Sequence, residues 1–148
     1  MCILRQQREI RLNAVLDAAI EAADHYEEEA ERVGDEAIAK LFADLSRRRR
    51  EMSKTMSAHI EKLGDLTREP DVEAELVHEM AYNIRTATED ARRVLLKERI
   101  EAEEDLESRI RAARETDLPA DTLGVLEEYE DDARTAAAEL SDLLVRYL

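Results

Sequence analysis

Residues 12–45, LNAVLDAAIEAADHYEEEAERVGDEAIAKLFADL, decide the fold. Up to Val33, apolar side chains recur every three or four residues, which places them along one face of a helix. Gly34 ends this pattern, because glycine readily adopts the conformation that closes a helix, and Asp35 is a suitable cap for the next one. The same spacing resumes after Asp35. The stretch therefore predicts two long helices joined by a tight turn.

A longer connection follows the second of these helices. Gly64 ends that helix, and residues 65–71 form the longest connection of the chain, with Pro70 inside it. A connection of this kind is where a helical bundle crosses from one end to the other. The apolar spacing over residues 72–84 predicts a short extra helix within the crossover.

Two further long helices are predicted in the second half of the chain. Apolar positions three and four residues apart predict them over residues 91–113 and 123–147. Thr86 and Thr88 are candidate caps for the first, and residues 117–121 supply a cap and a proline for the second. The expected fold class is all-α, an antiparallel four-helix bundle with a crossover connection that carries a short extra helix.

Composition limits the classes of function. The 148 residues are enough for one domain, which we expect over residues 12–148 after an N-terminal extension over residues 1–11. A net charge of -15 repels phosphate groups, which argues against a nucleic-acid partner and against an anionic membrane surface. Cys2 is the single cysteine, so no internal disulfide is expected, and the first residues lack the apolar run of a signal peptide. We expect a cytoplasmic protein.

Several short motifs are spread along the chain after residue 11. They are Leu12-Asn13, Asp24-His25-Tyr26, Leu41-Phe42 before an arginine run, Leu63-Gly64, Glu69-Pro70, His78 and Glu104-Asp105. With these motifs the chain resembles the bacterial ferritin-like four-helix-bundle proteins of unknown function. It differs from them at Met80 and Ala81, where the family pattern leads us to expect an aromatic residue. The resemblance implies a ferritin-like fold, and it does not imply iron chemistry.

A di-iron carboxylate bundle needs two Glu-x-x-His pairs, each on a different helix, and carboxylates from the other two helices. The one pair with this spacing is Glu75 and His78, and it lies on the predicted short helix. The second long helix carries Arg47 to Arg50 instead, and its apolar stripe passes through Arg48 or Arg49. A permanent cation near the core opposes metal binding and attracts carboxylates.

Two hypotheses remain open for the charged residues near the core. In the first, arginines and carboxylates form a buried polar cluster, whose expected members are Glu27, Arg48, Arg49, Glu98 and Glu130. In the second, the same side chains reach the surface and only their aliphatic stems are buried. No metal or other cofactor is expected. If a divalent metal such as iron is bound after all, its candidate ligands are Glu27, Glu98, Glu101 and Glu130.

No residue stands out as catalytic, because the three histidines lie on different segments without a fixed partner. The favoured function is a non-enzymatic helical bundle that works through protein contacts, as a homo-oligomer or in a stress-linked assembly. The alternative is a ferritin-like oxidoreductase or iron-handling protein with an unusual carboxylate site, which depends on the fold resemblance alone.

Overall fold

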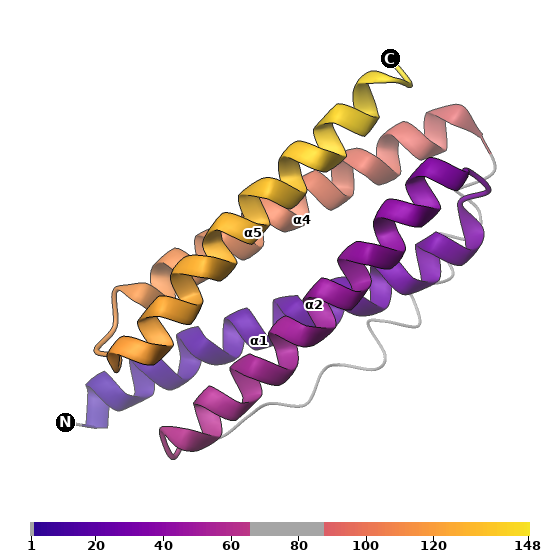
Figure 1. The fold of residues 1–148 in the computed structure, drawn as a ribbon. Coiled ribbons are helices and arrows are strands. Elements are labelled where there is room, and N and C mark those ends of the chain that lie inside the picture. Colours follow the sequence, from indigo (N-terminus) through magenta and orange to yellow (C-terminus); the bar gives the residue numbers. More distant parts are fainter. Residues whose placement is uncertain (1, 66–87) are drawn as a thin grey trace.

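A computed structural model describes residues 2–65 and 88–148 of the protein (Figure 1). These residues form four helices and no strand, as the sequence pattern predicts. The helices are α1 (Cys2–Arg32), α2 (Glu36–Lys62), α4 (Glu89–Arg114) and α5 (Ala120–Val145). The predicted short helix over residues 72–84, with Glu75 and His78, lies outside the described residues.

The four helices pack side by side as in a bundle. Helix α1 packs mainly on α2, and α4 packs mainly on α5. These two pairs meet through contacts of α1 with α4 and of α2 with α5, and the backbones of α2 and α5 make the sparsest contact (Figure 1). None of the described helices combines the length and the apolar character that a membrane span needs.

The predicted ends of the first two helices are confirmed. Gly34 and Gly64 adopt φ angles of 66° and 78°, a left-handed conformation that side chains disfavour and glycine accepts. Asp35 caps α2, because its side chain accepts a hydrogen bond of 3.0 Å from the backbone N–H of Ile38. Thr88 caps α4 in the same way, while Thr86 lies outside the described residues.

Two boundaries differ from the sequence expectation. Helix α1 begins at Cys2, so it continues through most of the residues expected as an extension. Arg8 holds this part of α1 against the end of α2, because it forms an ion pair with Asp65 at 2.9 Å. The expected side-chain cap of α5 was wrong: its N-cap residue is Pro119, which makes no side-chain hydrogen bond, and Asp121 instead contacts Lys62.

The apolar core consists of two separate clusters. One contains Leu12, Val15, Met52, Met56, Ile60, Leu106, Ile110 and Leu126. The other contains Tyr26, Val33, Ile38, Phe42, Leu45, Leu95, Leu96 and Leu140. Along α2 the change from one cluster to the other falls between Leu45 and Met52, at Arg49, which is fully buried.

Candidate functional site

Arg49 of α2 lies in the middle of the bundle with 0% of its surface exposed. Leu45, Arg49 and Met52 are spaced as one helical stripe, which explains why the arginine points into the core. Its guanidinium donates from Nε to Oε1 of Glu103 at 3.0 Å and from Nη2 to Oε2 at 2.8 Å. This is a bidentate, charge-assisted pair, the strongest geometry available to these two groups.

Glu103 of α4 is also bonded from α1. The Tyr26 hydroxyl donates to Oε1 of Glu103 at 2.8 Å. The Tyr26 ring is held edge-on against Phe42, with 5.1 Å between ring centroids. The guanidinium of Arg99 also contacts the Tyr26 ring, at 5.9 Å from the ring centroid. Arg99 in turn forms an ion pair with Glu29 at 3.3 Å. A second buried charge pair therefore adjoins the first.

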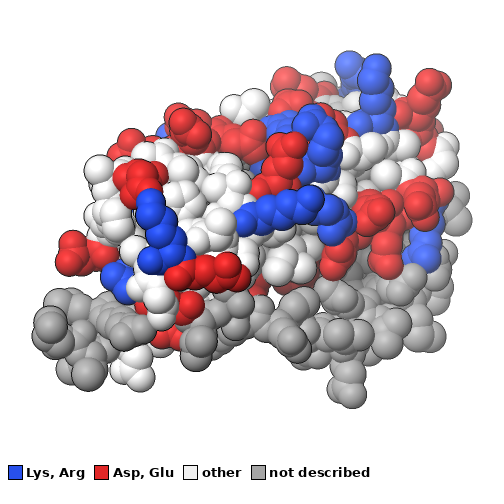
Figure 2. All heavy atoms as spheres, turned by 60° about the horizontal axis from the view of Figure 1, so that its bottom comes forward, with Lys and Arg blue, Asp and Glu red and all other residues white. Residues whose placement is uncertain are grey.

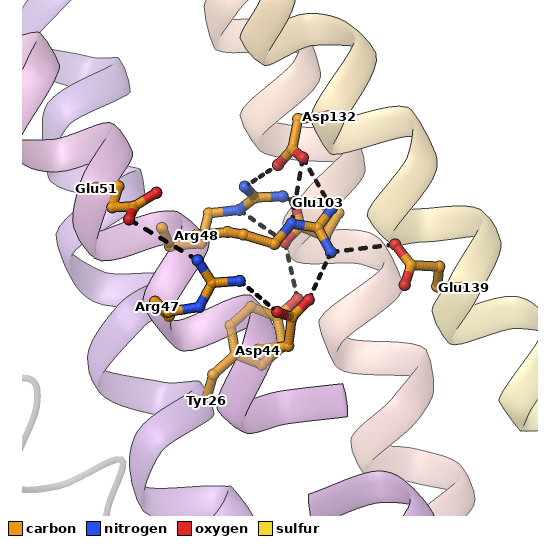
Figure 3. A network of polar contacts seen from close by, with 9 residues as sticks. Tyr26, Asp44, Arg47, Arg48, Glu51, Glu103, Asp132 and Glu139 are labelled. Atoms are coloured by element: carbon orange, nitrogen blue, oxygen red, sulfur yellow. Dashed lines mark hydrogen bonds and ion pairs between the residues drawn. The ribbon is translucent and has the colours of Figure 1, made fainter. Parts of the chain in front are cut away.

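Asp132 completes the arrangement from α5. It accepts hydrogen bonds from both Arg49 and Arg48, the latter at 2.8 Å from Nη2. Arg48 also pairs with Asp44 and Glu139, each at 3.1 Å. Figure 3 shows the guanidinium group of Arg48, on α2, pointing toward the carboxylates of Asp132 and Glu139 on α5.

We call the residues Tyr26, Arg48, Arg49, Glu103 and Asp132 the polar layer. Each of the four described helices contributes at least one of them, and the layer lies between the two apolar clusters. Hydrogen bonds satisfy the buried charges, which is the condition for such a layer to be tolerated inside a protein.

The electrostatics of the polar layer shift the pKa values of several of its groups. Burial opposes the charge of Arg49, but Glu103 and Asp132 outweigh it and raise the pKa of the guanidinium. Burial alone would raise the pKa of Asp132, yet the hydrogen bonds and charges of Arg49 and Arg48 lower it. Burial and the neighbouring Glu103 carboxylate raise the pKa of Tyr26 well above its ordinary value. All three pKa values move away from neutral pH, so these groups are poorly suited to exchange protons there.

A second ion cluster lies between α4 and α5. Its centre is Glu130, which is 5% exposed and which pairs with three arginines. These are Arg111, Arg114 and Arg134. Burial would raise the pKa of Glu130, but the arginines lower it. We call these four residues the Glu130 cluster.

The structure places the residues expected in the buried cluster at different sites. It brings Arg48 and Arg49 together in the polar layer, whereas Glu130 belongs to the other cluster. Glu27 is exposed and pairs with Arg50 at 2.8 Å, because it lies one position past Tyr26 and so faces outward. Glu98, which was expected in the buried cluster, is half-buried. Glu101, which was a candidate metal ligand only, is exposed.

Sequence reasoning missed Glu103, Asp132 and Tyr26 as members of the layer. For Glu103 a signal was present, because Leu96, Arg99, Glu103 and Leu106 follow one stripe at spacings of three and four. A charged residue in such a stripe position marks a buried ion pair. Asp132 lies beside the apolar stripe of α5 and carries no comparable signal.

The residues of the polar layer do not fit a di-iron centre. Both carboxylate oxygens of Glu103 already accept hydrogen bonds from a permanent cation. In residues 2–65 and 88–148, no three His, Cys, Asp or Glu side chains are grouped so that they could hold a metal ion. The metal-ligand candidates Glu27, Glu101 and Glu130 lie in three different surroundings, since Glu27 pairs with Arg50 and Glu130 with Arg111.

A family model described as a domain of unknown function, DUF2383, matches residues 9–116. The chain belongs to this family. The DUF2383 match covers most of α1 and the whole of α2 and α4, and so includes Tyr26, Arg49 and Glu103. Asp132 lies on α5, beyond the match. No curated protein and no solved structure matches the chain.

Proposed function

We propose that this DUF2383 protein is a non-enzymatic helical bundle that works through protein contacts, and that an ion network takes the place of a di-iron centre in its middle. The observation that carries the proposal is the bidentate bond between buried Arg49 and Glu103. An arginine keeps its charge at every physiological pH, so it competes permanently with any metal cation for these oxygens.

The proposed fold is the antiparallel, ferritin-like bundle with a crossover connection. Helix α2 ends next to the first turns of α1, as the bond from Arg8 to Asp65 indicates. Helix α4 begins next to the turn between α1 and α2, where Arg92 donates to the carbonyl oxygen of Val33 at 3.3 Å. These contacts are at opposite ends of the bundle (Figure 1), which supports a crossover between α2 and α4.

The polar layer supports a structural task better than a chemical one. Its carboxylates are occupied by arginines, and its tyrosine donates to a carboxylate. General acid–base catalysis requires a group whose pKa lies near the working pH, and the shifts of Arg49, Asp132 and Tyr26 all lead away from it. The network instead connects four helices and leaves their outer faces available for partners.

The test is aerobic addition of ferrous iron to the purified full-length chain, together with metal analysis after dialysis. We expect oxidation no faster than in a protein-free blank and no stoichiometric iron, manganese or zinc. The matched variants are Glu103→Gln, which removes the central carboxylate, and Glu104→Gln, which changes an exposed one on the same helix. Catalysed oxidation that Glu103→Gln abolishes and Glu104→Gln keeps would overturn the proposal in favour of the ferritin-like oxidoreductase.

A further inference from the structure

The contact between α2 and α5 leaves two grooves on the surface, each of about 490 Å³. Ala37, Leu41 and Leu143 line the first, and Thr55 and Tyr129 belong to the second. The sparse backbone contact between the two helices explains why their side chains do not fill this surface. We call the two grooves together the α2–α5 seam.

The two helices of the seam carry opposite charge. Helix α2 has seven Lys and Arg against four Asp and Glu, and it is the one described helix with a positive balance. Helix α5 has one Arg against eight Asp and Glu, the most negative balance of the four. Figure 2 shows acidic and basic side chains interspersed over much of the face that it draws. Among the pairs of described helices that contact each other, α2 and α5 therefore differ most in charge.

Each groove has one lysine of α2 and one carboxylate of α5 among its exposed lining residues. Lys40 and Asp142 line the first groove, and Lys54 and Glu128 line the second. All four residues are exposed. Among the described residues, none of the four forms an ion pair, in contrast to Arg48, which lines the second groove and pairs with three carboxylates. The charges at the two grooves are therefore available to a partner.

We propose that the α2–α5 seam binds a second copy of this chain, related by a two-fold axis parallel to the bundle. This proposal rests on the proposed function and names its partner. Such an axis places α2 of one subunit opposite α5 of the other. Each residue keeps its position along the bundle axis, because the rotation is about a line parallel to that axis. Lys40 then faces the partner subunit's Asp142, and Lys54 faces the partner subunit's Glu128, because each pair already shares one groove.

The charge pattern also excludes the other simple arrangement of two facing seams. A two-fold axis across the bundle would place α2 on the partner's α2 and α5 on the partner's α5. Lysines would then face a basic helix, and the α5 carboxylates that line the grooves, among them Glu128, Glu139 and Asp142, would face the carboxylates of the partner subunit's α5. Like charges across an interface are costly, while complementary ones select the orientation. A two-fold contact must be complementary to itself, and the seam meets this condition only with the axis parallel to the bundle.

Charge reversal of one helix at a time tests the interface. In Lys40→Glu/Lys54→Glu all four of these groove positions carry carboxylates, and in Glu128→Lys/Asp142→Lys all four carry lysines. Sedimentation equilibrium of the full-length chain should give a dimer for the wild type. Each double variant should show a dimer dissociation constant raised about 100-fold by like-charge repulsion. Circular dichroism verifies that both variants remain helical.

Mixing the two variants is the decisive measurement. An acidic seam and a basic seam complement each other, so the equimolar mixture should form a one-to-one heterodimer that weakens with added salt. The matched control is Glu101→Lys/Glu104→Lys, which changes the net charge by the same amount on exposed positions of α4 and should dimerise as the wild type does. A folded mixture that does not associate would overturn the interface.

The other outcomes are equally clear. A wild-type chain that stays monomeric leaves the seam to a different protein and overturns this proposal, as does dimerisation unaffected by both double variants. Failure of the proposed function would be seen in a different measurement. Catalysed iron oxidation by a chain that dimerises through the seam would overturn the non-enzymatic role and leave the interface intact.

Discussion

The polar layer and the Glu130 cluster use the same chemistry with the roles exchanged. In the polar layer a buried arginine, Arg49, is surrounded by carboxylates, and its main partner Glu103 has a side chain only 1% exposed. In the Glu130 cluster a buried carboxylate is surrounded by three arginines, whose side chains are 34% to 53% exposed. The first arrangement connects four helices, whereas the second connects α4 with α5.

The difference shows that the contribution of an ion pair to the free energy of unfolding depends on how deeply both partners are buried. If Glu130 is changed, its arginines can turn to water at little cost. If Arg49 is changed, Glu103 stays inside the bundle with a charge that water cannot reach. The two clusters therefore provide a matched pair of experiments within one protein.

The largest effect is expected for Arg49→Met. The substitution keeps an unbranched apolar side chain in the core but leaves the Glu103 carboxylate without its cation. We expect a loss of about 4 kcal/mol in the free energy of unfolding, measured by urea denaturation. A loss below about 1 kcal/mol would show that water reaches Glu103 and would contradict the burial of the layer.

The double variant Arg49→Met/Glu103→Leu is the control for that result. Removing both charges together also removes the unpaired one, so its stability should recover most of the loss. Tyr26 loses its acceptor in this variant, and adding Tyr26→Phe should restore a further part.

The next effect in size is expected from low pH, which should destabilise both clusters. Their carboxyls Asp132 and Glu130 have pKa values below the ordinary 3.8 and 4.5, because arginines bind the charged forms. The unfolded chain then takes up protons first as the pH falls, so the stability that these groups provide is present above about pH 5 and is lost below it. Urea titrations between pH 7 and 3 should show a smaller decline for Asp132→Asn than for the wild type. An equal decline would mean that Asp132 is not held in its charged form.

A smaller effect is expected for Glu130→Gln. The amide keeps the shape and still accepts hydrogen bonds from Arg111, Arg114 or Arg134, while these arginines remain open to water. We expect a loss of about 1 kcal/mol in the urea-unfolding free energy. A loss as large as that of Arg49→Met would contradict the proposed difference in stability between the two clusters.

The smallest effect is expected outside both clusters, for Tyr147→Phe. The Tyr147 hydroxyl donates to Asp35, the cap of α2, and burial together with this carboxylate raises the pKa of Tyr147 to about 12. The substitution should cost about 0.5 kcal/mol at pH 7. In the wild type this contribution should disappear as the pH rises from 10 to 12, because the folded chain holds the proton longer than the unfolded one. The variant should lack that alkaline decline.

Much of the fold was predictable because its signals are local. Gly34, Gly64 and Asp35 act within a few residues of themselves, and the helices end and begin where these residues predict. The start of α1 was harder to predict, because the stripe weakens before Leu12 and the bond from Arg8 to Asp65 joins distant segments. Pro119 as the cap of α5 likewise has no side-chain signal.

The site was predictable only in part, for a related reason. The stripe of α2 alone indicated an arginine near the core. Its partners depend on how far α4 and α5 are displaced along α2, and a pattern within one helix does not contain that displacement. Glu103 could have been found as a charged residue in an apolar stripe, but Asp132 could not.

The division of the core by the polar layer also fixes the register of the helices. A wholly apolar core would allow one helix to slide past its neighbours by a turn, about 5.4 Å, and still bury leucine against leucine. In this bundle such a slide would carry the Arg49 guanidinium away from Glu103 and in among apolar side chains such as those of Leu45 or Met52. A buried polar side chain from each helix is enough to leave the chain a single way to align all four.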